Sequence, residues 1–293
     1  MKKVLFAVVS ALLVAVMAVS AVACSGGTKV KVIEIDLSAE EYGIAIEKGN
    51  TELKTQIDEI VNDLIGDGVD VDGKKVKFND IYLEEMEAFE NGEFLSIGEV
   101  ATESANRDNE LVVATNAEFA PFEYISGESF GGIDMQVAKI VADKMGKTLV
   151  IKHMAFESVI GSITTGMADI GMAAMTISAD RLEEVDFSVP YCKTAQRIAV
   201  AADDTRFDEC KTAEDVNNVL KGLSGVKAGG ATGQTGLYYL QGSEDFGFEG
   251  FANLEIQQFT KVSNAVQALV SGNIEIVCAD RDTLKVATDG VNR

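Results

Sequence analysis

The 293-residue sequence contains no tryptophan, two prolines, four cysteines and a single histidine, His153. Zinc sites and Ser-His or Cys-His catalytic pairs need histidines or closely spaced cysteines, and no CxxC spacing occurs. These scarcities argue against a metal site and against nucleophilic catalysis of that kind. The sequence therefore predicts neither a metal nor another cofactor.

Basic residues are also scarce, with 25 lysines and arginines against 47 aspartates and glutamates and a formal net charge of -22. A surface of this charge repels nucleic acid and anionic membranes, so we expect no nucleic-acid partner. The net charge does not define a ligand, because the field inside a cleft is set by the residues that line it.

Long apolar runs are confined to residues 1–23. Lys2 and Lys3 precede an apolar stretch that ends in small residues directly before Cys24. This order is typical of a signal peptide, and a transmembrane anchor is the competing interpretation. The small residues before Cys24 and the polar residues after it favour cleavage and lipidation of Cys24. We therefore expect an extracytoplasmic protein, lipid-anchored to the membrane at the periplasmic face or the cell surface.

The rest of the chain alternates strand and helix patterns, which predicts an α/β fold. Hydrophobic residues make up 47% of the sequence, and the length suggests two domains on a soft prior of about 150 residues each. One pseudo-repeat stands out, because residues 163–170 resemble residues 269–276. Each combines a helix end, a glycine and a buried strand, and the two segments lead to Arg181 and Asp280.

Arg181 follows the predicted strand 169–175 by about five residues. Ligands of open α/β sheets bind beyond the carboxyl ends of the strands, where an arginine can hold a carboxylate with two parallel hydrogen bonds. The alternative is a surface arginine paired with Glu183 or Glu184. For Asp280 the alternative is an N-cap of the helix that follows it.

Three motifs then occur in a recognisable order: residues 112–124 (VVATNAEFAPFEY), 131–142 (GGIDMQVAKIVA) and 185–191 (VDFSVPY). Together they closely resemble the polar amino-acid family of extracellular solute-binding proteins that feed ABC importers, from about residue 111 to about residue 288. The resemblance implies a type II periplasmic-binding-protein fold. This fold has two lobes, each a mixed sheet flanked by helices, joined by two crossover strands, here expected at 41–46 and 195–201.

The N-terminal block departs from the family's order. Residues 41–53, an amphipathic helix and residues 78–82 resemble the pattern with which family chains normally end, whereas here they come first. We therefore predict a circular permutant, with a truncated protein behind an unrelated N-terminal domain as the alternative. The predicted segments are a signal peptide at 1–23, lobe 2 at 24–40 and 202–293, lobe 1 at 41–201, and a linker at 92–110 that joins the ancestral termini.

An α-amino acid carries a carboxylate and an ammonium on one carbon, so its site needs a fixed cation and a fixed anion. The resemblance assigns Arg181 to the carboxylate and Asp280 to the ammonium, with the carbonyl of Ala174 as a second acceptor for the ammonium. Thr176 and Thr235 would add donors, since Thr235 lies in a glycine-rich turn that opens a helix. The phosphate-loop pattern GxxxxGK[ST] is absent, which argues against a nucleotide ligand.

Phe119 and Phe156 match positions that pack against the ligand side chain, and ordinary core packing is the alternative for both. Asn116 stands where many family members have aspartate, which weakens the case for a cationic ligand. We expect Asn116→Asp to shift preference toward cationic amino acids. Cys210 and Cys278 fall in the same predicted lobe, where a disulfide and buried free thiols are both compatible with the sequence.

The resemblance implies a monomeric, non-enzymatic binding protein that captures an amino acid and delivers it to an ABC permease. Two alternatives remain. A few family relatives are dehydratases with a catalytic carboxylate in the cleft, for which Glu118 or Glu157 would be the candidate. A ligand-sensing module is the other, although no signalling domain follows.

Overall fold

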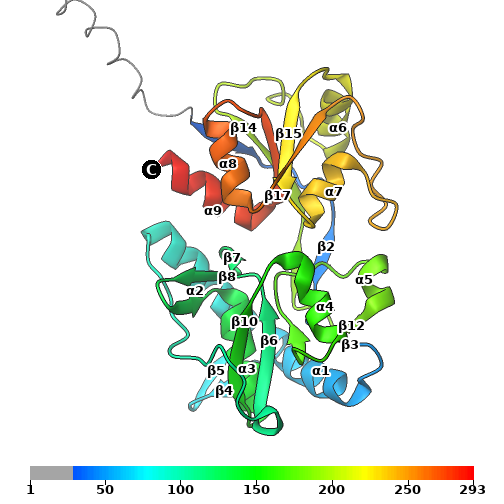
Figure 1. The fold of residues 1–293 in the computed structure, drawn as a ribbon. Helices are drawn as coiled ribbons and strands as arrows, with labels where there is room; N and C mark the ends of the chain where they lie inside the picture. The colour runs from blue at the N-terminus through cyan, green and yellow to red at the C-terminus, as the bar shows by residue number, and fades with distance from the viewer. Residues whose placement is uncertain (1–28) are drawn as a thin grey trace, which may run out of the picture.

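The computed structural model describes residues 29–293 and shows two lobes, one above the other in Figure 1. The predicted signal peptide and the lipidation site Cys24 lie outside the described residues. Among residues 29–293, no helix has the length and apolar character that a membrane span requires.

Lobe 1, the lower lobe in Figure 1, is built on a mixed five-stranded sheet. Two of its strands pair in parallel with β6, the second strand of the sheet, and the strand from the N-terminal block pairs antiparallel with its neighbours. The strands, in spatial order, are β10 (Thr148–His153), β6 (Glu110–Thr115), β11 (Ile170–Gly171), β3 (Ala45–Glu47) and β12 (Val185–Phe187).

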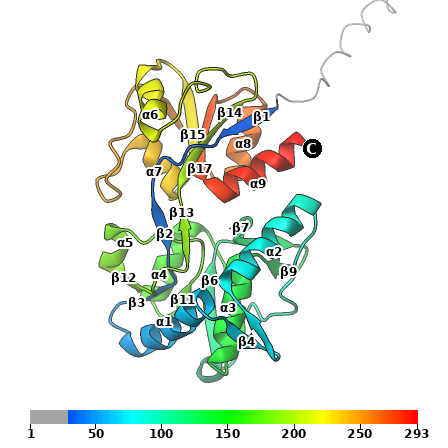
Figure 2. The ribbon, with the colours of Figure 1, turned by 180° about the vertical axis from the view of Figure 1, so that it is seen from behind.

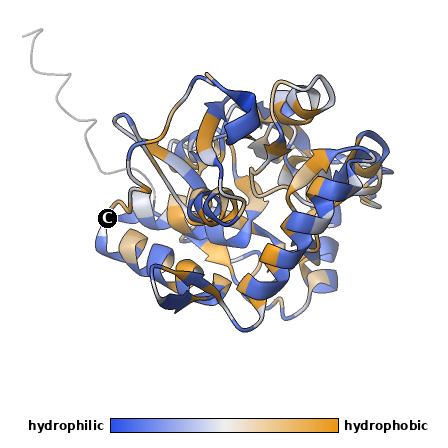
Figure 3. Ribbon diagram, turned by 90° about the horizontal axis from the view of Figure 1, so that it is seen from below, coloured by the Kyte–Doolittle hydropathy of each residue, from blue (hydrophilic) through white to orange (hydrophobic). Residues whose placement is uncertain are grey.

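Helices cover this sheet, and short strands and single 3-10 turns complete the lobe. In Figure 3 the helix ribbons carry both hydrophobic and hydrophilic residues, as expected of amphipathic helices that cover a sheet. The helices are α1 (Thr51–Ile65), α2 (Phe78–Asn91), α3 (Ile133–Lys144), α4 (Val159–Thr164) and α5 (Ala179–Glu184). The shorter elements are β4 (Val69–Val71), β5 (Lys74–Val76), β7 (Glu118–Phe119), β8 (Glu123–Ser126), β9 (Ser129–Gly131), η1 (Arg107–Asn109) and η2 (Phe156–Ser158).

Lobe 2 contains a second mixed five-stranded sheet with helices on its faces, so the predicted α/β architecture is confirmed. Its strands, in spatial order, are β1 (Val30–Ile33), β14 (Gln196–Ala201), β17 (Ile276–Asp280), β15 (Lys227–Ala231) and β16 (Glu255–Phe259). Its helices are α6 (Ala213–Gly222), α7 (Thr235–Gln241), α8 (Val262–Val270) and α9 (Arg281–Asn292).

The N-terminal block is divided between the two lobes. β1 pairs antiparallel with β14 and so lies in the same sheet as β17, whereas β3 lies inside the sheet of lobe 1. The helices α1 and α2 pack on each other and on α3. Asn50 caps α1 through its side chain, and the buried face of this helix follows helical spacing. The block therefore forms no separate domain.

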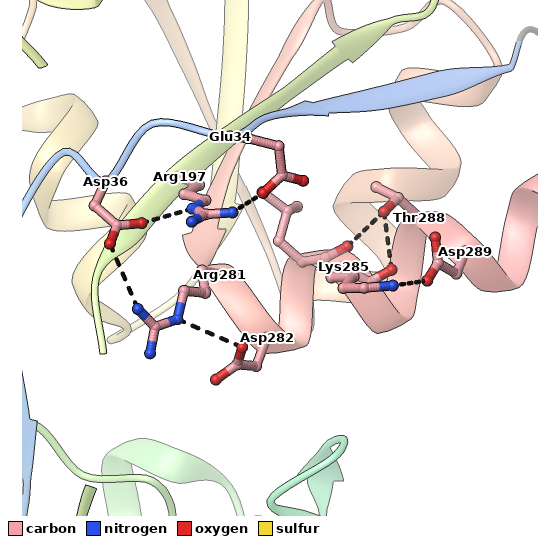
Figure 4. Close-up of polar contacts among 9 residues, drawn as sticks. Glu34, Asp36, Arg197, Arg281, Asp282, Lys285, Thr288 and Asp289 are labelled. Atoms are coloured by element: carbon pink, nitrogen blue, oxygen red, sulfur yellow. Dashed lines mark hydrogen bonds and ion pairs between the residues drawn. The ribbon is translucent and has the colours of Figure 1, made fainter. Parts of the chain in front are cut away.

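An ion-pair network fixes the segment after β1 to lobe 2 (Figure 4). Arg197 on β14 donates to Asp36 at 2.6 Å and also pairs with Glu34. Arg281, the first residue of α9, lies 3.4 Å from the same Asp36 carboxylate. These contacts join the segment after β1, the strand β14 and the helix α9, which are far apart in sequence.

The crossover strands differ from the prediction. The strands that run between the lobes are β2 (Glu40–Tyr42) and β13 (Cys192–Thr194), which pair antiparallel and lie side by side in Figure 2. The predicted crossover 195–201 corresponds instead to β14, a buried strand of lobe 2, so the end of lobe 1 moves from residue 201 to before residue 196. The other predicted crossover, 41–46, overlaps both β2 and the lobe 1 strand β3, and the crossovers in the structure are short and partly polar.

Candidate ligand-binding site

A buried cavity lies between the lobes, at the point where the strands of both sheets end. Lobe 1 contributes the residues that follow β11, and lobe 2 contributes the end of β17 and the start of α7. Its lining residues are Phe119, Phe156, Ala173, Ala174, Thr176, Arg181, Gln234, Thr235 and Asp280. The structure thus brings together seven of the eight residues predicted to bind ligand, and Asn116 is the exception. Their roles stay predictions, because a cavity lining does not identify a ligand.

The lobes are closed in this structure. The cavity measures about 10 Å³, close to the volume that one water molecule needs. Thr176 of lobe 1 and Thr235 of lobe 2 lie 3.2 Å apart through their hydroxyls. Lys261 of lobe 2 lies 3.7 Å from Glu118 of lobe 1. An amino acid therefore enters only when the lobes separate or the lining side chains move.

Arg181 is a buried cation, with 6% of the residue exposed. Its guanidinium donates to the carbonyl of Thr176 at 2.8 Å and, across the cleft, to the carbonyl of Gly233 at 3.3 Å. Burial lowers the pKa of Arg181, but an arginine in a protein keeps its charge. The alternative of a surface arginine is wrong, since the side chain is buried and lines the cleft. Its hydrogen bonds use two of its five N–H donors.

Asp280 is the matching anion from lobe 2, and it is the last residue of β17. Its carboxylate accepts a 2.5 Å hydrogen bond from the hydroxyl of Tyr42, on the crossover strand β2. Burial, together with the nearby carboxylate of Glu40, raises the pKa of Asp280 to about 7. Asp280 occupies the N-cap position of α9, but its side chain makes no capping hydrogen bond. The carboxylate is thus available to the cleft.

Glu40 is a second buried carboxylate of this region, and sequence reasoning missed it. It accepts hydrogen bonds from Ser38 at 2.5 Å, from Thr176 at 2.9 Å and from Gln196 at 3.3 Å. These partners come from the crossover segment, lobe 1 and lobe 2. Nothing in the sequence distinguishes Glu40 from its exposed neighbour Glu41, because only the strand register decides which of them faces inward.

The backbone at Ala174 has the left-handed conformation, with φ of 46°, which is uncommon for a residue other than glycine. The N–H of Ala174 donates to the Asp134 carboxylate at 2.8 Å, and the Tyr191 hydroxyl donates to the same carboxylate at 2.9 Å. Burial raises the pKa of Asp134 to about 7. Strained backbone of this kind is found at binding sites. Asp134 lies in the motif 131–142, but sequence reasoning assigned it no role at the site, and the structure shows it as a supporting residue.

The remaining residues singled out from the sequence do not line the cavity. Asn116 is buried and donates through its amide to the carbonyl of Met154 at 2.8 Å. An aspartate at this position would lose that hydrogen bond, and it would not face the cavity directly. Glu118 pairs with Lys261 and, like Glu157, does not line the cavity. The cysteines of residues 29–293 are free thiols, so Cys210 and Cys278 form no disulfide here.

Residues 111–234 match the family model of bacterial extracellular solute-binding proteins, family 3. This part of the chain is therefore similar to that family. It is 28% identical to a probable histidine-binding protein of Neisseria gonorrhoeae over 62% of this chain and 63% of that protein. It is 28% identical to the arginine-binding extracellular protein ArtP of Bacillus subtilis over 59% of this chain and 61% of the relative. It therefore spans about three fifths of the length of these curated relatives.

Solved structures of amino-acid-binding proteins share the fold. An arginine-bound ArgBP mutant from T. maritima matches with a TM-score of 0.51 and 28% identity, over 63% of this chain and 79% of that one. The ancestral binding protein AncCDT-1, described as a precursor of cyclohexadienyl dehydratase, matches with a TM-score of 0.52 and 28% identity, over 61% and 74%. Cyclohexadienyl dehydratase of Pseudomonas aeruginosa is 25% identical over 126 residues, 42% of this chain and 45% of that enzyme. The comparisons therefore include binding proteins and one enzyme.

Proposed function

We propose that this solute-binding protein captures an amino acid between its lobes and delivers it, chemically unchanged, to the permease of an ABC importer. One observation carries the proposal: Arg181 and Asp280, a buried cation and a buried anion from opposite lobes, line one cavity. Opposite charges on the two sides of a closing cleft suit the carboxylate and ammonium of an α-amino acid. An extracytoplasmic protein anchored through lipidated Cys24 remains our expectation for its location.

Each lobe would bind one charged group of the ligand. The planar guanidinium of Arg181 suits a carboxylate, because it can donate two parallel charged hydrogen bonds. The ammonium would lie between the Asp280 carboxylate and the carbonyl of Ala174, with Glu40 adding negative potential. Neither lobe holds both charges, so the ligand gains most in the closed form and shifts the population toward it. Bending at the β2–β13 pair would provide the hinge.

Ligand binding is expected to raise the melting temperature in a screen of the twenty common L-amino acids. A ligand that binds only the native state adds about 2.7 kcal/mol of stability at a concentration one hundred times Kd. Calorimetry on each hit then gives the affinity. No stabilisation by any of the twenty, at millimolar concentration, would contradict the proposal.

The same sample distinguishes a binding protein from an enzyme. After overnight incubation of protein with each stabilising amino acid, we expect mass spectrometry to recover the ligand unchanged. Glu118 and Glu157 do not line the cavity, which favours binding over catalysis. Conversion of the ligand by the parent protein, but not by Glu118→Gln or Glu157→Gln, would instead support the dehydratase alternative.

A further inference from the structure

A phenylalanine of lobe 2 lies beside the arginine of lobe 1, although neither the motifs nor the family resemblance pointed to it. The Cζ atom of Arg181 lies 5.5 Å from the ring centroid of Phe246, and 5.2 Å from that of Phe156 in lobe 1. We infer that Phe246 is a ligand-site residue that covers the carboxylate-binding arginine when the lobes close and so slows ligand release. This inference rests on the proposed function.

A short hairpin presents Phe246 to the cleft. Ser243 and Phe248 pair through two backbone hydrogen bonds of 2.9 and 2.8 Å, and the N–H of Gly247 donates to the carbonyl of Glu244 at 3.0 Å. The ends of the hairpin approach so closely that a Cβ at Gly250 would lie 2.3 Å from the backbone nitrogen of Gly242. The loop is thus built around glycine and has a defined shape.

Other aromatic rings of lobe 2 pack against the Phe246 ring. Phe246 stacks on Tyr238 of α7 with 5.1 Å between the ring centroids, and it lies 6.0 Å from Phe248. The helix α7 begins at Thr235, which lines the cavity itself. Movement of lobe 2 therefore carries the hairpin and the half-site of Thr235 together, so closure brings Phe246 to Arg181 in the same step.

An aromatic ring suits this position for a chemical reason. Its π face attracts the guanidinium without consuming the N–H donors that a carboxylate needs. Phe246 also lines a groove of about 610 Å³ with Thr176 and Ser178 of lobe 1. The ring thus borders both the buried arginine and an open groove. Excluding water there strengthens the ion pair with a bound carboxylate.

The first test measures ligand release by stopped flow. The probe is the L-amino acid that raises the melting temperature of the parent protein most among the twenty. Phe246→Ala is expected to raise the dissociation rate at least five-fold, the equivalent of about 1 kcal/mol, with the association rate nearly unchanged. Phe246→Tyr, which keeps the ring, should restore slow release. The matched control is Glu244→Ala, an exposed residue of the same hairpin, which should behave like the parent.

An unchanged dissociation rate in Phe246→Ala would overturn the inference while leaving the proposed function intact, because the probe would still bind. An equal rise in Glu244→Ala would also overturn it, since the effect would then belong to the hairpin and not to the ring. If no amino acid stabilises the parent protein, this result contradicts the proposed function, and the inference about Phe246, which rests on it, is contradicted as well.

The second test uses the absence of tryptophan from the sequence. In Phe246→Trp all tryptophan emission comes from the hairpin. Ligand addition should shift this emission to shorter wavelength as the indole leaves water, with the same Kd that calorimetry reports. Calorimetric binding without a spectral change would show that the ring does not respond to closure, and would contradict the inference.

Discussion

Replacing Arg181 with alanine is expected to weaken amino-acid binding by about 2–5 kcal/mol, the usual cost of removing one partner from a desolvated charge pair. The ligand carboxylate would then be buried without a cation. The fold should survive, because Arg181 lies at the cleft and its side chain donates hydrogen bonds to two backbone carbonyls. Calorimetry measures the loss, and the melting temperature without ligand reports on the fold.

Arg206→Ala is the matched control for this prediction. Arg206 pairs with Asp204 at 2.7 Å and with Glu275 at 3.1 Å, in lobe 2 and away from the cavity. Its loss removes one positive charge from the protein but none from the site. Equal affinities of the parent and Arg181→Ala would exclude Arg181 as the carboxylate anchor.

Replacing Asp280 with asparagine is expected to cause a loss of similar size and to remove the pH dependence of binding. The Asp280 pKa is about 7, and only the ionised carboxylate pairs with an ammonium. The affinity of the parent should therefore rise as the pH increases through 7 and level off by about pH 8. Asparagine keeps the size and an acceptor for the Tyr42 hydroxyl but cannot ionise, so the profile of the variant should be flat.

Calorimetric titrations between pH 5.5 and 8.5 test this prediction. Other buried carboxyls with raised pKa values, Asp134, Glu123 and Glu85, remain in both proteins and cancel in the comparison. A parent affinity that stays constant over this range would show that no titration at Asp280 is linked to binding. A parallel rise in both proteins would assign the titration to another group.

The sequence predicted the parts of the site that follow from chain order. In a repeated sequence pattern, Arg181 follows the strand β11 and Asp280 ends the strand β17, and both residues line the cavity. The missed residues depend on contacts between distant segments. Glu40 faces inward only because of how β2 pairs with β13, and Phe246 reaches Arg181 only through the meeting of the lobes.

The wrong placement of one crossover strand at residues 195–201 also arises because the sequence does not show contacts between distant segments. Apolar runs indicate burial, but they do not state whether a buried strand lies in a sheet or between two lobes. Residues 196–201 are buried in the sheet of lobe 2, while the shorter crossover at Cys192–Thr194 includes the exposed Lys193. Short strands of mixed polarity carry too little periodic signal to be placed from sequence alone.

We propose, as the sequence order suggested, that the chain is a circular permutant of the solute-binding proteins that it resembles. The sharing of residues 29–91 between both lobes supports this proposal. The backbone N–H and carbonyl of Val30 both bond to the Asn292 side chain, at 3.0 and 2.8 Å, so the two ends of the described chain lie together.

This proximity allows a direct test of the permutation. A variant that joins residue 293 to residue 29 through a short glycine-serine linker, with new termini opened in segment 92–106, would restore the family's order of elements. It should fold with a similar melting temperature and bind the same ligand. A variant that fails to fold would contradict the proposal that both orders specify one structure.

The most direct test of the account compares three related ligands by calorimetry on the unmodified protein. They are the amino acid identified in the thermal screen, the amine that lacks its carboxylate, and the acid that lacks its ammonium. If Arg181 and Asp280 each hold one of these groups, both analogues should bind at least about 100-fold more weakly than the amino acid. An analogue that binds as tightly as the amino acid would contradict the central claim that the two lobes hold the ligand by opposite charges.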